Sequence, residues 1–223
     1  MENSVARWVI GGKTDDVQSL HSLTRTDWAV PSVWIMSPTD CCLVLGSSQD
    51  DACVDYAYAE QRDIGIARRT TGGGAVLVDP QELLWVDLFV PRDHFLWKDD
   101  IHEASNWLGK IWQSALGALG VDSQLHDGPF QRTAIAELIC FAGCGPGELL
   151  IENKKILGIS QRRTREGVRF QSALALEWKP ENWISLFDAA AIENMESAIF
   201  AAGTCVRVEK NEILRAFLRA LNS

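Results

Sequence analysis

The chain has no long apolar segment and no leader-like start. Its apolar runs are far shorter than the ~20 residues that a membrane-spanning helix needs, so we expect no transmembrane helix and no membrane partner. The first residues, MENS, are not a basic segment followed by an apolar one, which predicts no signal peptide. Both absences favour a cytoplasmic location.

The sequence also lacks the motifs of several common sites. Its six cysteines form no C-x-x-C pair and its four histidines are widely spread, which predicts free thiols and no metal site. No G-x-x-x-x-G-K-[ST] or G-x-G-x-x-G loop is present, so the two common nucleotide-binding folds are not indicated. The absence of G-x-S-x-G excludes the usual hydrolase nucleophile turn.

Basic residues are few. The formal net charge is −9, and because a duplex binder needs a basic face, we expect no nucleic-acid partner. Residues 154–169 depart from this balance, since Glu166 is the single acid among six cations. These cations are Lys154, Lys155, Arg162, Arg163, Arg165 and Arg169. Such a patch indicates an anionic ligand or an acidic partner surface, and a solvated basic turn is the alternative interpretation.

Short apolar runs and turn residues predict an α+β fold. Strands are expected at 33–36, 42–45, 64–69, 75–78, 83–90, 148–152, 156–161 and 170–178. Helices are expected at 55–62, 99–119, 183–187, 189–200 and 209–221. We therefore predict one domain over residues 1–223, with a mainly antiparallel or mixed sheet flanked by helices.

Residues 67–79, ARRTTGGGAVLVD, are the most informative segment. Glycine permits a positive φ and lets a ligand approach the main chain closely. Three glycines beside Arg68, Arg69 and Thr71 can present N–H groups and fixed cations to one anion. A tight hairpin with two surface arginines is the alternative interpretation.

Lys155 favours the anion-binding interpretation. It precedes the apolar run 156–159 and is expected to leave a turn and enter a strand, whose pleat fixes the direction of its side chain. If the side chain points inward beside the glycines, its charge needs an anion. Cations around a glycine loop suit an acyl phosphate or acyl adenylate, because they neutralise the charge that develops on its oxygens.

Three segments, in this order, resemble the lipoate–protein ligase A family of the biotin/lipoate protein ligase superfamily. They are 43–49 (LVLGSSQ), 68–76 (RRTTGGGAV) and 155–161 (KILGISQ). The resemblance covers about residues 30–178, with 181–223 as a helical extension. It implies a biotin-synthetase-like catalytic domain, related to class II synthetases. Such a domain attaches a lipoyl or octanoyl group to a lysine of a lipoyl-domain protein.

The same resemblance implies site residues. Lys155 takes the position of the lysine that binds both the acyl carbonyl and the phosphate. The nucleotide and acyl contacts fall on Arg68, Arg69, Thr71, Gly72, Gly73, Gly74, Ala75, Val76, Leu77, Gly158 and Ser160. As a ligase, the protein would use ATP with Mg²⁺ and take lipoate or octanoate, with the acyl chain in an apolar tunnel.

Two departures from the family pattern bear on the mechanism. The family usually has a histidine before the aspartate that follows the glycines, where this chain has Val78. ATP-using members tend to have Asn-Asp upstream of the lysine, where segment 140–144, CFAGC, holds no carboxylate for Mg²⁺. Its Cys140 instead resembles the octanoyltransferase branch, in which a thiolate takes the acyl group from acyl carrier protein. The nearby cations can stabilise that thiolate, and a small buried hydrophobe is the alternative interpretation.

Three functions therefore stay open. The first is an ATP-dependent ligase that works through an acyl adenylate, and the second is an octanoyltransferase that uses Cys140. The third is a non-catalytic module that binds the acyl adenylate. Biotin ligation is weaker, because the paired arginines and the segment after Lys155 fit the lipoate branch better.

Overall fold

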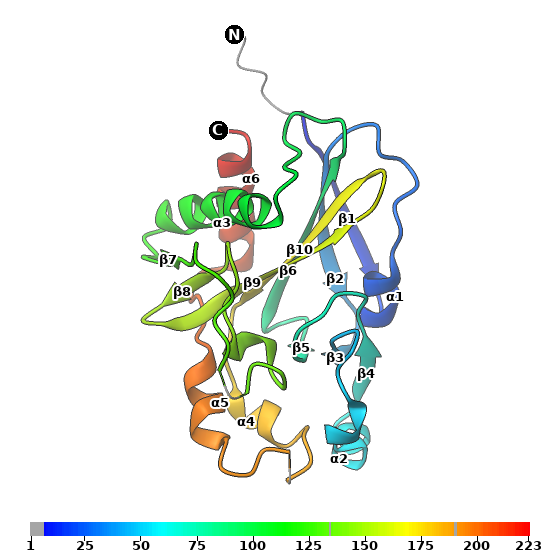
Figure 1. The fold of residues 1–223 in the computed structure, drawn as a ribbon, viewed down its shortest axis with the longest axis vertical. Coiled ribbons are helices and arrows are strands. Elements are labelled where there is room, and N and C mark those ends of the chain that lie inside the picture. Colours follow the sequence, from blue (N-terminus) through cyan, green and yellow to red (C-terminus); the bar gives the residue numbers. More distant parts are fainter. Residues whose placement is uncertain (1–6, 134, 190) are drawn as a thin grey trace.

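The computed structural model describes residues 7–133, 135–189 and 191–223, which form two β-sheets (Figure 1). The larger sheet has seven strands. In spatial order they are β1 (Val9–Asp15), β2 (Ser32–Pro38), β6 (Leu83–Pro91), β10 (Gly167–Ala175), β9 (Lys154–Arg163), β8 (Leu149–Ile151) and β7 (Gln124–Leu125). β1 and β2 are parallel, and the other neighbouring pairs are antiparallel. The prediction of a mixed, mainly antiparallel sheet is therefore confirmed.

The smaller sheet places the glycine segment. It consists of β4 (Ile64–Arg68), β3 (Cys41–Leu45) and β5 (Val76–Val78), with β3 in the middle. β3 is parallel to β4 and antiparallel to β5. Because β3 separates the other two strands, the triple glycine crosses from one edge of this sheet to the other. The hairpin interpretation is therefore wrong, and Arg69 is buried at 6% exposure.

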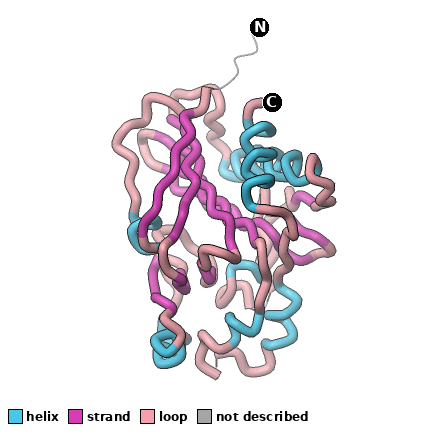
Figure 2. The backbone as a smooth tube through the Cα atoms, turned by 180° about the vertical axis from the view of Figure 1, so that it is seen from behind, coloured by secondary structure: helices cyan, strands magenta, loops and turns pink. Residues whose placement is uncertain are grey.

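Two helices cover one face of the larger sheet. α3 (Ile101–Gly117) and α6 (Lys210–Leu221) pack together near the carboxyl terminus (Figure 2). Trp112 of α3 stacks on Phe217 of α6, with ring centroids 4.1 Å apart. The Trp112 indole N–H donates to the Ser172 hydroxyl of β10 at 3.1 Å, so α3 is tied directly to the sheet.

The other helices lie around the smaller sheet. They are α1 (Val17–Ser22), α2 (Tyr56–Gln61), α4 (Pro180–Ile184), α5 (Glu196–Ala202) and the short 3₁₀ helices η1 (Asp51–Cys53) and η2 (Cys140–Ala142). η2 and α5 share a hydrophobic core with β3 and β5. The Ala75 N–H donates to the Leu138 carbonyl at 2.8 Å, and the Cys140 N–H donates to the Ala75 carbonyl at 2.9 Å. These bonds hold the loop that carries Cys140 against the end of the glycine segment.

The predictions omit β1, α1, β7 and the two 3₁₀ helices. β1 shows no apolar alternation, because it is exposed along nearly its whole length. The helix expected at 189–200 is wrong over its first half, because Asn194 has a φ of 63° and regular helix begins only at Glu196. Residue 190 lies outside the described part of the chain.

Other expectations have simpler outcomes. All six cysteines are free thiols, as predicted. Across the described residues, no helix combines the length and apolarity needed to cross a membrane. That residues 1–223 form a single domain stays a prediction.

A buried ion pair joins β6 to β10 and anchors α1. The Asp87 carboxylate, fully buried, lies 2.6 Å from the Arg169 guanidinium. The same guanidinium donates to the carbonyl oxygens of Leu20, His21 and Leu23 at the carboxyl end of α1. Because terminal carbonyls have no partner within a helix, Arg169 caps α1 from the sheet.

Replacing Asp87 with Ala is expected to lower the free energy of unfolding by about 3–5 kcal/mol, because the Arg169 charge then stays buried without its partner. Urea denaturation followed by tryptophan fluorescence measures this loss. The exposed Lys98–Glu103 pair, 3.3 Å apart, supplies the control, and Glu103→Ala should cost less than about 1 kcal/mol. Equal losses in the two variants would contradict the anchoring role of Asp87.

Candidate active site

A cavity of about 270 Å³ lies between the two sheets. Its apolar wall comprises Val44, Val76, Val78, Leu83, Trp85, Phe130, Ala136, Phe141, Pro146, Ile159 and Ala173. Its charged and polar side chains are His21, Arg69, Ser105, Cys140, Glu148, Lys155, Ser160, Gln171 and Ser172. A mainly apolar wall with a few convergent polar groups is typical of a small-molecule site.

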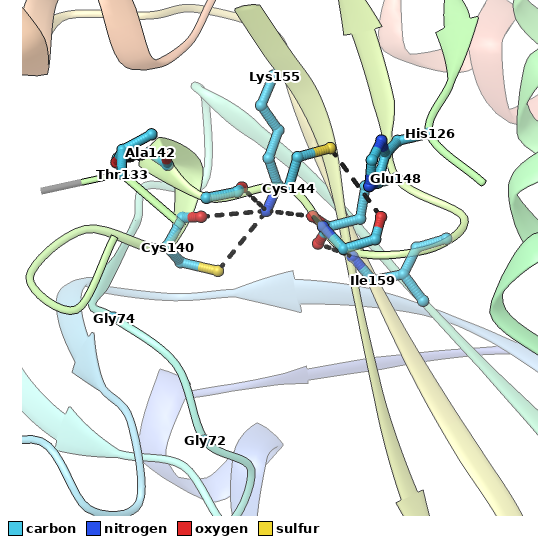
Figure 3. A network of polar contacts seen from close by, with 12 residues as sticks. Gly72, Gly74, His126, Thr133, Cys140, Ala142, Cys144, Glu148, Lys155 and Ile159 are labelled. Carbon is cyan, nitrogen blue, oxygen red and sulfur yellow. Dashed lines mark hydrogen bonds and ion pairs between the residues drawn. The ribbon is translucent and has the colours of Figure 1, made fainter. Parts of the chain in front are cut away.

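Lys155 is the centre of a buried polar network in this wall (Figure 3). Its side chain is 2% exposed, and its ammonium lies 2.7 Å from Glu148 Oε2. The ammonium also donates to the carbonyl oxygens of Cys140 and Gly143 at 3.1 Å each. The Cys140 sulfur lies 3.9 Å from the same nitrogen. Lys155 and the three glycines line the same cavity.

The hairpin between β8 and β9 sets the direction of Lys155. Glu152 and Asn153 form its turn with φ values of 51° and 62°, the left-handed pair that suits a two-residue hairpin. Alternation along β9 then points Lys154 to solvent and Lys155 into the protein. Burial disfavours the ammonium, but the negative charges available at Cys140 and Glu148 outweigh it, so the pKa of Lys155 lies above its ordinary value.

Glu148 is the site residue that the sequence analysis missed. It is 5% exposed, and its Oε2 accepts from the Gly145 N–H at 2.7 Å in addition to Lys155. Its Oε1 accepts from the Ile159 N–H at 3.0 Å. Segment 140–144 itself holds no carboxylate, and the acid beside the lysine comes from Glu148, four residues further along the chain. The signal available was an acid seven residues before Lys155, at the end of a glycine-rich turn that enters a strand.

Arg69 holds the glycine segment in place. Its guanidinium donates to the carbonyl oxygens of Val44 at 3.2 Å and of Gly72 and Gly74 at 2.8 Å each. Burial lowers its pKa. In the described residues no carboxylate forms an ion pair with Arg69. A buried cation without an acidic partner favours an anion in the adjoining cavity.

Main-chain segments approach each other so closely around the glycine loop that several positions there have no room for a side chain. A Cβ on Gly46 would lie 1.9 Å from the Gly73 carbonyl oxygen, and one on Gly74 would lie 2.7 Å from the Ala136 carbonyl oxygen. Gly73 has a φ of 96°, which disfavours any other residue. A Cβ on Gly72 would meet nothing within 4 Å.

The predicted site residues divide into two groups. Those that line the cavity are Arg69, Gly72, Gly73, Gly74, Val76, Cys140, Lys155, Gly158 and Ser160. Those outside its wall are Arg68, Thr71, Ala75 and Leu77. Arg68 points elsewhere, because its guanidinium donates to the carbonyls of Gly46 and Gln49 and pairs with Asp51 at 3.7 Å. The roles of the lining residues toward a ligand stay predictions.

Two cysteines lie beside Lys155, and their surroundings differ. Cys140 lines the cavity. Cys144 is buried, and burial together with the charge of Glu148 raises the pKa of its thiol to about 12. Cys144 therefore stays a neutral thiol at physiological pH, and Cys140 is the sulfur available at the cavity.

The donor set does not fit a protein-held magnesium ion. Within the described residues, no group of three or more His, Cys, Asp or Glu side chains could hold a metal. Glu148, the carboxylate nearest Lys155, already accepts hydrogen bonds on both oxygens. Any Mg²⁺ would therefore need its ligands from a bound phosphate or from solvent.

Gly74→Ala is expected to destabilise the protein by about 1–3 kcal/mol and to displace the Cys140 loop, because the new methyl group would overlap the main chain near Ala136. Thermal unfolding and the reactivity of Cys140 toward a thiol reagent measure the two effects. Gly72→Ala is the matched control and should be tolerated, since its added carbon meets open space. Equal effects of the two substitutions would show that close packing of this loop is unimportant.

Glu148→Gln is expected to lower the free energy of unfolding by about 3–5 kcal/mol, because the buried Lys155 ammonium loses its counter-ion. Urea denaturation at pH 7 measures the change. The control is Glu152→Gln, on the exposed turn of the same hairpin, and it should stay within about 0.5 kcal/mol of the parent protein. If Glu148→Gln lowers the free energy of unfolding by no more than the control does, Glu148 is not the counter-ion of Lys155.

Comparisons with known proteins agree with this geometry. Residues 18–206 match the lipoyl protein ligase A/B catalytic domain. The comparison with curated proteins found no match. Among solved structures, the chain is similar to a lipoate protein ligase of Thermoplasma acidophilum, studied with its E2 lipoyl domain. That similarity has 17% identity and a TM-score of 0.68, over 95% of this chain and 82% of that chain.

Two further solved structures are similar at the level of the fold. One is lipoate-protein ligase A bound with ATP, with 18% identity and a TM-score of 0.67, over 96% of this chain and 83% of that chain. The other is P. falciparum LipL1 in complex with lipoate, with 10% identity and a TM-score of 0.65, over 96% and 61% of the two chains. Since the family match spans most of the sequence and contains the cavity between the sheets, this chain belongs to the lipoyl protein ligase A/B catalytic-domain family.

Proposed function

We propose that the protein is an acyltransferase that moves a lipoyl or octanoyl group from a thioester donor to a lysine of a lipoyl-domain protein, with Cys140 as the nucleophile. One observation carries this proposal: the Cys140 sulfur lies 3.9 Å from the buried ammonium of Lys155, at the wall of a mainly apolar cavity. An apolar cavity suits an acyl chain, and a cysteine sulfur at its wall can act as a nucleophile toward a thioester.

The charge balance of the site supports the same proposal. Lys155 is neutralised by Glu148 at 2.7 Å, whereas Arg69 is buried among carbonyl oxygens without a carboxylate partner in the described residues. The charge of Arg69 is therefore not balanced by a carboxylate of the described residues. Negative charge that develops on the acyl group during the transfer would be stabilised by this cation.

The transfer takes place in two balanced steps. In the first, the Cys140 sulfur attacks the thioester carbonyl, a new carbon–sulfur bond forms, and the donor leaves as a thiol that takes up the Cys140 proton. In the second, the neutral amine of the acceptor lysine attacks the acyl-cysteine. An amide bond forms, the carbon–sulfur bond breaks, and the sulfur takes up the amine proton. The three N–H donors of Lys155 are already used within the protein, so its positive charge stabilises the negative carbonyl oxygen through its electric field and not through a hydrogen bond.

The partners follow from this chemistry. The donor is an acyl thioester, for which acyl carrier protein is the proposed carrier. The acceptor is a lipoyl-domain lysine. A related ligase of T. acidophilum was studied together with its E2 lipoyl domain, which supports this class of acceptor.

An ATP-dependent ligase is the second candidate, with lipoate or octanoate activated as an acyl adenylate. The unpaired charge of Arg69 also suits a phosphate or carboxylate in the cavity. A fold relative, lipoate-protein ligase A, binds ATP. In this route, bound ATP supplies the activation of the acid, and Lys155 and Arg69 hold the anionic groups in place.

The two candidates are separated by a transfer assay on a lipoyl domain, read by mass spectrometry. One mixture contains octanoyl or lipoyl acyl carrier protein without ATP, and the other contains the free acid with Mg-ATP. We expect modification in the first mixture and an acylated Cys140 peptide. Cys140→Ala should reduce the rate at least about 100-fold, because it removes the nucleophile.

Cys144→Ala is the matched control and should keep most of the rate, since that thiol stays neutral and buried. Modification in the ATP mixture alone, with Cys140→Ala fully active, would replace the thioester proposal with the ligase. Binding of the acyl adenylate without transfer in either mixture would identify a non-catalytic module.

A further inference from the structure

The cavity has a second polar group that the proposed chemistry does not use. His21, in the last turn of α1, and Gln171 of β10 line the same cavity as Lys155 but share no hydrogen bond with its network. The surrounding wall is apolar. Val44, Val78, Leu83 and Trp85 belong to one buried cluster, and Ala173 packs against it.

The His21 side chain is held firmly. Its ring lies against Trp85 with centroids 4.4 Å apart. Its own carbonyl oxygen, and those of Leu20 and Leu23, accept hydrogen bonds from Arg169, which is paired with Asp87. α1 therefore cannot rotate His21 away from the cavity without breaking a buried ion-pair network. This is the arrangement expected of a positioned side chain rather than a mobile surface residue.

The His21 imidazole is neutral at physiological pH. Burial, together with the positive charges of Arg169 and Arg69, lowers the pKa of His21 to about 3. Nδ1 lies 3.4 Å from the Gln171 amide nitrogen, which donates to it. The ring proton is then on Nε2, and no described residue accepts a hydrogen bond from Nε2. The cavity thus contains a neutral N–H donor beside a mainly apolar wall.

The apolar wall beside His21 belongs to a different buried cluster from η2, the element that carries Cys140, so His21 borders the part of the cavity remote from Cys140. We propose that His21, oriented by Gln171, is a specificity-determining residue that donates a hydrogen bond to an acceptor atom at the far end of the acyl chain. The inference rests on the proposed function only in that the cavity holds an acyl chain. The two groups left open differ at that end. A lipoyl group ends in a dithiolane ring, whose sulfurs are weak acceptors, whereas an octanoyl group ends in a methyl. His21 therefore selects the sulfur-bearing chain.

The physical reason lies in the cost of an unpaired donor. A chain that ends in carbon covers the Nε2–H and leaves it without a partner, whereas a sulfur at the same place accepts its hydrogen bond. A binding site that forms a hydrogen bond with its ligand discriminates strongly against an analogue that lacks the hydrogen-bonding atom. A site that distinguishes ligands only by their shape discriminates less. The preference should therefore depend on the acceptor atom and not on the size of the ring.

Binding of free acids to the intact protein tests this dependence. We would measure the dissociation constants of (R)-lipoate and of 5-cyclopentylpentanoate, its carbocyclic analogue, by isothermal titration calorimetry at pH 7.5. The wild type is expected to bind lipoate roughly 5–10-fold more tightly, the range of one net hydrogen bond. His21→Phe keeps an aromatic ring against Trp85 and should reduce the ratio to about one. His21→Asn, which keeps a neutral donor, should restore part of it.

The carbocyclic acid is also the folding control, since His21→Phe should bind it within about twofold of the wild type. His102→Phe, on the exposed side of α3, should keep the wild-type ratio. An unchanged ratio in His21→Phe, or no preference in the wild type, overturns the inference. If thioester transfer through Cys140 is not observed but the preference for lipoate depends on His21, the proposed mechanism is wrong and the proposed selectivity site is supported. The reverse result removes only the selectivity site.

Discussion

The site depends on the buried ion pair between Lys155 and Glu148. Neither charge is stable alone at 2–6% side-chain exposure, and each has its remaining hydrogen-bonding capacity filled by the main chain. Glu148 accepts from the N–H groups of Gly145 and Ile159, and Lys155 donates to the carbonyls of Cys140 and Gly143. The pair thus joins the loop before β8 to the strand β9. The position of the Cys140 sulfur is a consequence of that connection.

Arg69, on the opposite side of the cavity, is also a buried cation whose N–H groups are satisfied by main-chain carbonyl oxygens. Its N–H groups are directed to the carbonyls of Val44, Gly72 and Gly74, so the triple glycine presents carbonyl oxygens to a cation of its own chain. The sequence suggested the reverse, with N–H groups and arginines turned together toward a ligand. A pattern of residue types cannot distinguish these arrangements, because both require a main chain that approaches closely and a cation beside it.

The fold was largely predictable from the sequence, and the failures have specific causes. The pattern of apolar runs located β6 and α3, because each buries a continuous stripe. β1 has almost no buried face, so its hydrophobic pattern is absent although its pairing with β2 is regular. The pairing of β4 and β5 across β3 could not be read from local signals, since glycines between two strands also suit a hairpin.

The candidate site was predictable only in part for a similar reason. Lys155 could be found because a strand fixes the direction of its side chain, and Cys140 because its segment resembles one branch of a known family. For Glu148 the sequence offered only the weak signal of an acid seven residues before Lys155, and for His21 it offered none. Their importance arises from partners far along the chain: Ile159 for the first, and Trp85 and Gln171 for the second. The sequence around a residue does not predict contacts of this kind.

The unpaired positive charge of Arg69 is compatible with both of the proposed chemistries. Thioester transfer would develop negative charge on the acyl oxygen, whereas adenylate formation would bring the negative charges of the free acid and of ATP. The scaffold of cations and carbonyls needs no change between them. In this chain the Cys140 sulfur lies 3.9 Å from the Lys155 ammonium at the wall of the cavity. Under the proposed function this sulfur, and not bound ATP, determines which chemistry the cavity performs.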